Sequence, residues 1–167
     1  MHEFGRQTLL LRGCVWLLTL SVSWNVIAQD EKTYTKEELQ TLYMDYLKGE
    51  GFRPEIDEDG DVVFKREGKL YFIAIDETDP HFFRLVFPNF WEIESFVEHQ
   101  KVLLAIDYSN RLSKVSKLHT TTDNVWAGVE TFVEDPKDFE PHFYRYIASI
   151  ENGVRNYVSY MRDEVEE

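Results

Sequence analysis

Tight turns divide the first half of the sequence into short segments that run back on one another, and this feature restricts the fold most. An Asp-Gly pair is a strong signal for a two-residue hairpin turn. Strands joined in this way pair antiparallel, because parallel neighbours need a long crossover connection. Turns at Asp59-Gly60 and Glu67-Gly68 separate three predicted strands, at 52–57, 61–66 and 69–76. The sequence therefore predicts an antiparallel sheet built from hairpins.

Three helical segments accompany these strands. Thr35 and Glu38 fit a capping box, so a first helix begins there. Pro88-Asn89 is expected to end the sheet, with Asn89 capping a second helix. Asp135-Pro136 opens a third, with proline at its first position. Adding a fourth strand at 82–87 and a second hairpin at 114–133 gives the order α-β-β-β-(β)-α-β-β-α. This order is typical of an α+β domain with helices packed on a sheet.

Apolar spacing predicts which surfaces are buried. The second helix is expected to be deeply packed, because it is apolar nearly all round over 102–106. The strand at 69–76 is apolar on both faces, which predicts a central strand covered at least partly on both sides. Pro54 predicts that the first strand lies at the edge of the sheet. The predicted buried face of the second helix consists of Ile93, Phe96, Val97, Leu103, Leu104 and Tyr108.

The first 28 residues have the three parts of a secretory signal peptide. Arg6 and Arg12 supply positive charge, an apolar run follows at 14–22, and Ala28 precedes the polar Gln29. The run is too short for a stable membrane anchor, which needs about 20 residues. We expect cleavage between Ala28 and Gln29, export to the periplasm, and a single domain over 29–167. The alternative is an uncleaved N-terminal membrane helix.

Cysteine and charge limit what the exported domain uses for stability and binding. Cys14 is the only cysteine of the 167 residues, so the segment after Ala28 forms no disulfide and depends on an apolar core. The formal net charge is −13. Nucleic acid is a poor partner for such a chain, because binding it depends on Lys and Arg that neutralise phosphates.

The motifs expected of catalytic and metal sites are not found in the sequence. The histidines after Ala28 are widely spaced, and no His-Glu-x-x-His pattern occurs. The acidic turn at 57–61 is a poor calcium loop, because Arg66 falls where a calcium-binding loop needs its bidentate glutamate. We therefore predict no catalytic residues, no metal ligands and no cofactor.

Aromatic residues at the ends of elements are the remaining candidates for a binding site. Phe82 precedes a strand, Phe90 and Trp91 fall at the expected start of the second helix, and Trp126 lies near a hairpin tip. Aromatic side chains are enriched where proteins recognise one another. The four residues are a predicted recognition patch, and the alternative is that they close the core.

Five segments carry a family resemblance: FRPEIDEDGDVVF at 52–64, FRLVFP at 83–88, DYSNR at 107–111, KLH at 117–119 and VWA at 125–127. They resemble the YbjN family, bacterial domains described as regulators of sensory transduction. The resemblance covers about residues 35 to 160. It implies a fold similar to type III secretion chaperones, small α+β domains that often dimerise and bind partner segments. It supplies no catalytic residues, and Asp107 stands where the family often has asparagine.

Together these features predict an exported, non-enzymatic binding module. Its expected partner is a protein or peptide, and a homodimer is a further expectation. The alternatives are a small-molecule binder, a carboxylate-based hydrolase of the cell envelope, or a purely structural envelope protein.

Overall fold

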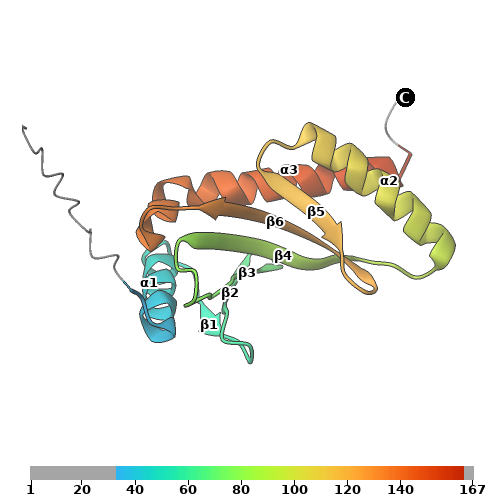
Figure 1. Ribbon diagram of the computed structural model, residues 1–167. Coiled ribbons are helices and arrows are strands. Elements are labelled where there is room, and N and C mark those ends of the chain that lie inside the picture. Colours follow the sequence, from blue (N-terminus) through green and yellow to red (C-terminus); the bar gives the residue numbers. More distant parts are fainter. Residues whose placement is uncertain (1–32, 164–167) are drawn as a thin grey trace, which may run out of the picture. The chain divides into compact units, whose positions relative to one another are not determined.

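A six-stranded antiparallel sheet with helices packed on it makes up the computed structural model, which describes residues 33–163 (Figure 1). The strand order is β1-β2-β3-β4-β6-β5. The elements are α1 (Lys36–Gly49), β1 (Glu55–Ile56), β2 (Val62–Arg66), β3 (Lys69–Ile73), β4 (Phe82–Glu92), α2 (Phe96–Leu112), β5 (Ser116–Thr120), β6 (Asn124–Phe132), the 3₁₀ helix η1 (Pro136–His142) and α3 (Phe143–Met161). The α+β class and the hairpin-built antiparallel sheet are confirmed. The signal peptide, with Ala28 and Gln29, lies outside the described residues.

The first helix begins where the capping box predicts. The Thr35 hydroxyl accepts the Glu38 N–H at 3.2 Å, and the Glu38 carboxylate accepts the Thr35 N–H at 2.9 Å. Both bonds satisfy amides that a helix start otherwise leaves unpaired. Leu39, Tyr43 and Leu47 form the buried stripe of α1.

The acidic turn between β1 and β2 is held by one aspartate. Oδ1 of Asp57 accepts the amide N–H groups of Asp59, Gly60 and Asp61 at 2.9–3.1 Å. Gly60 has a φ of +92°, a conformation that favours glycine. The acidic residues therefore shape a turn, as expected. β1 lies at the edge of the sheet, as Pro54 predicts.

The prediction that Pro88-Asn89 ends the sheet is wrong. β4 continues to Glu92, and its register against β6 shifts between Phe87 and Trp91. Such a bulge lets a strand pass a proline, which has no N–H for the ladder, and Asn89 takes a positive φ of 49°. The second helix instead begins at Phe96, capped by the Ser95 hydroxyl. Phe90 and Trp91 therefore belong to a strand and not to a helix start.

The predicted buried face of the second helix is wrong for four of its six residues, because Phe96, Val97, Leu103 and Leu104 are exposed, whereas Ile93 and Tyr108 are half-buried. The buried residues of α2 are Val102, Ala105 and Ser109. The reason is close packing against α3, where the Ser109 hydroxyl donates to the Gly153 carbonyl at 2.8 Å. Small side chains allow α2 to approach α3 closely, so the larger apolar side chains of α2 remain on its exposed side.

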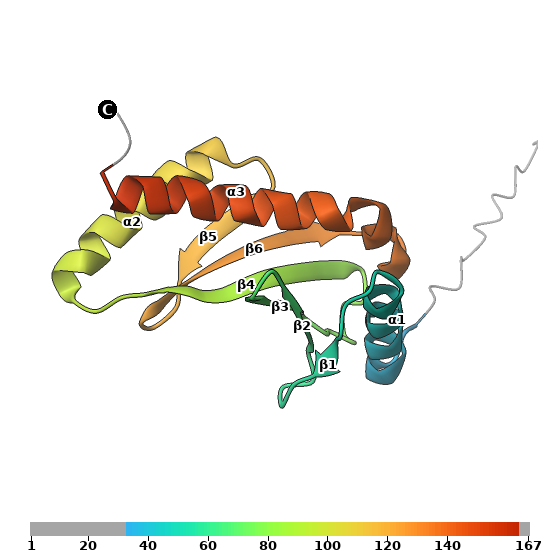
Figure 2. The ribbon, with the colours of Figure 1, turned by 180° about the vertical axis from the view of Figure 1, so that it is seen from behind.

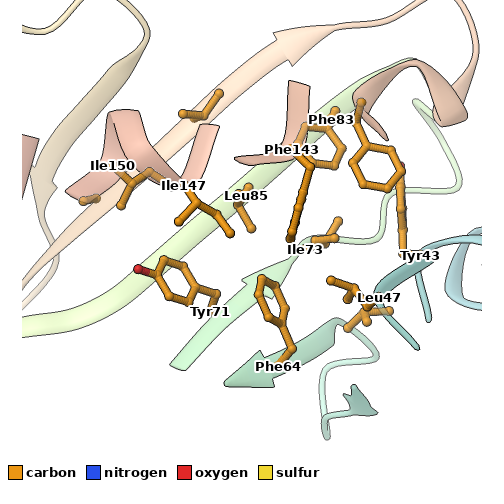
Figure 3. Close-up of a cluster of buried hydrophobic side chains, with 14 of the residues drawn as sticks. Tyr43, Leu47, Phe64, Tyr71, Ile73, Phe83, Leu85, Phe143, Ile147 and Ile150 are labelled. Carbon is orange, nitrogen blue, oxygen red and sulfur yellow. The ribbon is translucent and has the colours of Figure 1, made fainter. Parts of the chain in front are cut away.

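The core lies between one face of the sheet and α3, which runs across it (Figure 2). In the close-up of Figure 3, Ile147 and Ile150 of α3 lie near Tyr71 and Leu85 of the sheet. The opposite face carries no helix of residues 33–163. β3 is an interior strand, as expected, and on this face Phe72 and Ala74 are half-buried whereas Leu70 is 42% exposed, so the strand is covered only partly on this side.

Candidate functional site

Part of strand β2 has an unpaired edge. β1 pairs with β2 only at Val62 and Val63, and no strand of the described chain lies beside the rest of β2 on that side. Arg66 and Lys69 close the β2–β3 hairpin. Because hydrogen-bonded and non-bonded positions alternate in antiparallel pairs, the N–H and C=O of Lys65 point away from β3, toward the open edge.

A groove with a volume of 410 Å³ lies beside this edge. Phe52 and Phe64 line it, with ring centroids 5.2 Å apart, and Leu70 lines it from the other face of the sheet. Arg53 and Lys65 add positive charge to the same lining. Backbone polar groups, apolar side chains and cations therefore meet along one strand edge.

The opposite edge of the sheet is closed. The backbone N–H of Ser116 in β5 donates to the Ser149 hydroxyl at 3.1 Å, and Asn110 of α2 bonds the main chain of Leu118. Covering an edge with a helix is a common way to prevent unwanted strand addition. The contrast makes the open edge of β2 the candidate site for an added strand.

An ion-pair cluster fixes the β2–β3 hairpin to α3. Oε1 of Glu151 accepts bonds from Arg66 at 2.8 Å, Lys69 at 3.1 Å and the Tyr71 hydroxyl at 3.3 Å. Burial raises the pKa of Glu151, but its bonds and charge interactions with Lys69, Arg66 and Tyr71 outweigh burial, so the pKa lies below its ordinary value. Burial and the Glu151 charge raise the pKa of the Tyr71 hydroxyl. The cluster keeps the open edge in place.

A second unpartnered surface runs along α2, and we call it the α2 ridge. Phe96 and Val97 are 78% and 79% exposed, and Leu103 and Leu104, two turns further on, are 44% and 58% exposed. Residues seven and eight positions apart lie on one side of a helix. A contiguous exposed apolar surface of this kind is typical of a protein–protein contact.

The predicted aromatic residues do not form one patch. Phe90 and Trp91 pack edge-on against Tyr157 of α3, with ring centroids 5.3 and 5.4 Å away. The Trp91 indole also donates to Glu98 at 2.9 Å. Phe82 and Trp126 instead alternate with buried residues of β4 and β6, which places them on the open face.

On that open face the two aromatic residues have separate neighbours. Phe82 contacts Phe132, and Trp126 contacts Phe72 and donates to Asn89 at 2.8 Å. Binding by any of the four predicted residues stays a prediction. Sequence reasoning missed Phe52, Lys65 and Leu70, although the edge signal of Pro54 pointed to their neighbourhood.

A groove between α1 and η1 carries four carboxylates, from Glu37, Glu38, Asp45 and Glu140. The Glu38 carboxylate is engaged in the helix cap.

Within residues 33–163, no cluster of His, Cys, Asp or Glu is suited to a metal ion. In the same part of the chain no helix is long and apolar enough to span a membrane.

One solved structure, that of the HopA1–SchA chaperone–effector complex, contains a chain with a similar fold. The TM-score is 0.50 at 12% identity, and the match covers 71% of this chain and 94% of that chain. At this identity the likeness shows the fold, and the predicted type III secretion chaperone-like fold is confirmed. No protein-family model and no curated protein matches the sequence. Membership of the YbjN family stays a prediction.

Proposed function

We propose that this chain is a protein-binding module that holds an extended segment of a partner polypeptide at the open edge of β2. The observation that carries the proposal is the outward-pointing backbone of Lys65 beside the groove that Phe52 and Leu70 line. A segment added there extends the sheet by one strand. Main-chain hydrogen bonds supply affinity, and alternate side chains enter the groove to supply specificity.

The likeness to a chain of a chaperone–effector complex supports this proposal at the level of fold. A small α+β domain of this shape is compatible with holding another polypeptide. The residues of the groove come from this chain's own geometry and not from that comparison.

Proline at position 65 tests the site directly. Lys65→Pro removes an N–H that points away from β3, so the β2–β3 ladder loses no hydrogen bond. Displayed peptides selected on the wild-type protein are expected to bind the matched control Lys65→Thr normally and Lys65→Pro at least tenfold more weakly. Leu70→Asp, which places a charge in the groove and leaves the backbone unchanged, is expected to weaken the same peptides. If the selected peptides bind the wild type and all three variants equally well, the open edge of β2 is not their binding site.

We also propose that the α2 ridge joins two copies of the chain. An exposed apolar surface on one helix can meet its own copy about a two-fold axis, which is the commonest symmetry of soluble oligomers. Sedimentation velocity is expected to show a dimer for the wild type and a monomer for Phe96→Ser with Leu104→Ser. A wild-type monomer at high micromolar concentration contradicts this arrangement.

From the sequence we propose that the protein is located in the periplasm. N-terminal sequencing of the protein recovered from a bacterial periplasmic extract is expected to begin at Gln29. A protein that retains Met1 and fractionates with the membrane or the cytoplasm contradicts export with cleavage.

A further inference from the structure

A further concave surface lies between α3 and the strands β3 and β4, with a volume of 440 Å³. Its apolar lining comes from Phe87, Val154 and Val158. Three cations surround that lining: Lys69, Arg155 and Arg162. We call this surface the cationic pocket.

The two arginines are placed to act together. Arg155 lies on α3, and Arg162, seven positions further on, is the residue that caps the C-terminal end of this helix. At that spacing the two lie on one side of the helix, about 10 Å apart along its axis. Val158 lies between them in the sequence and lines the same pocket. A ligand along this side of α3 therefore meets positive charge at two points and an aliphatic surface between them.

Lys69 is paired with Glu151, but no ion pair within residues 33–163 offsets the charges of Arg155 and Arg162. The one carboxylate in the lining of the cationic pocket, Glu151, already accepts bonds from Arg66 and Lys69. Arg155 donates to the neutral side chain of Asn152 at 3.2 Å. In a chain of net charge −13, this surface favours a negatively charged ligand.

We propose that the cationic pocket binds an acidic segment of the partner polypeptide, in which carboxylates flank an aliphatic side chain. This inference rests on the proposed function and names the chemistry of the partner. Carboxylates pair with the guanidinium groups of Arg155 and Arg162, which can bind them through two parallel hydrogen bonds. The aliphatic residue packs on Val154 and Val158. A nucleic acid fits less well, because the strongly acidic chain repels a polyanion and the floor of the pocket is apolar.

Fluorescence anisotropy with a labelled peptide of alternating glutamate and leucine tests the inference. Arg155→Gln with Arg162→Gln is expected to weaken binding at least tenfold, with circular dichroism confirming that the variant is folded. The matched control is Lys114→Gln with Lys117→Gln, which removes two exposed cations outside the pocket and is expected to change binding less than twofold. A peptide with glutamine in place of glutamate is expected to bind at least tenfold more weakly.

Three outcomes overturn the inference. They are no binding of the glutamate peptide at millimolar concentration, equal binding of the glutamine peptide, and equal losses in the arginine and lysine variants. Lys65→Pro separates this inference from the proposed function. Lys65 does not line the cationic pocket, so this variant is expected to bind the glutamate peptide normally while losing the selected peptides. A failure of the proposed β2 site therefore gives a different result from a failure of the cationic pocket.

Discussion

The Asn110 side chain forms two hydrogen bonds with the main chain of Leu118. Its Oδ1 accepts the Leu118 N–H at 2.9 Å, and its Nδ2 donates to the Leu118 carbonyl at 3.1 Å. The amide of Asn110 thus takes the place that a neighbouring strand would occupy beside β5. This arrangement closes the sheet at β5, in contrast to its open edge at β2.

Removing the Asn110 amide is expected to destabilise the domain. Asn110→Ala leaves both main-chain groups of Leu118 without these bonds and is expected to lower the free energy of unfolding by about 1–3 kcal/mol, measured by urea denaturation. The Leu118 amide should also exchange its hydrogen faster. Asn110→Asp keeps the acceptor and loses the donor, so an intermediate loss is expected. Unchanged stability and exchange in Asn110→Ala would show that the edge is closed by α2 packing alone.

Glu151→Gln is expected to cost stability at neutral pH and much less in acid. The pKa of Glu151 is lowered in the folded protein, so ionisation stabilises the fold above the ordinary glutamate pKa of about 4.3. This contribution disappears as the pH falls through the folded-state pKa. Urea denaturation should give a difference from wild type of about 1–3 kcal/mol at pH 7, shrinking below pH 4. A difference that does not depend on pH would show that the charge of Glu151 is unimportant.

Gly153→Ala tests the close contact of α3 with β5. A Cβ at this position would lie 3.0 Å from Cδ1 of Leu118 and 3.2 Å from the Ser116 hydroxyl. Overpacking of this kind costs about 1–3 kcal/mol, whereas alanine in a helix gains about 1 kcal/mol over glycine. A net loss of about 1 kcal/mol is expected from thermal denaturation. Gly49→Ala is the control, because nothing lies within 4 Å of its Cβ, and it should be neutral or stabilising.

The two sides of α2 are expected to respond differently to truncation. Val102→Ala removes buried methyl groups and should lower the free energy of unfolding by about 1–2 kcal/mol. Val97→Ser lies on the exposed ridge and should change the stability of the monomer by less than about 0.5 kcal/mol. Denaturation at low protein concentration, where a dimer dissociates, compares the two. A larger loss of stability for Val97→Ser than for Val102→Ala would mean that the α2 ridge is buried within the monomer.

Local signals in the sequence determined much of the architecture. The hairpin turns, the capping box of Thr35 and Glu38, and the Asp135-Pro136 start of the third helical segment all lie where the sequence predicts. Each depends on residues close together in the chain, whose turn and cap chemistry acts without distant partners. The α+β class followed from the order of these elements, and the chaperone-like fold was implied by the resemblance to the YbjN family.

The tertiary structure alone decided which surfaces stay open. Periodicity marked α2 as apolar, but the small residues Ser109 and Gly153 select its buried side by allowing close approach to α3. The passage of β4 through Pro88 depends on its pairing with β6, which a local turn signal does not contain. The open edge of β2 and the cationic pocket likewise join residues distant in the chain, such as Lys69 and Arg162. Local patterns fix the elements, whereas exposure depends on how the shapes of distant elements fit together.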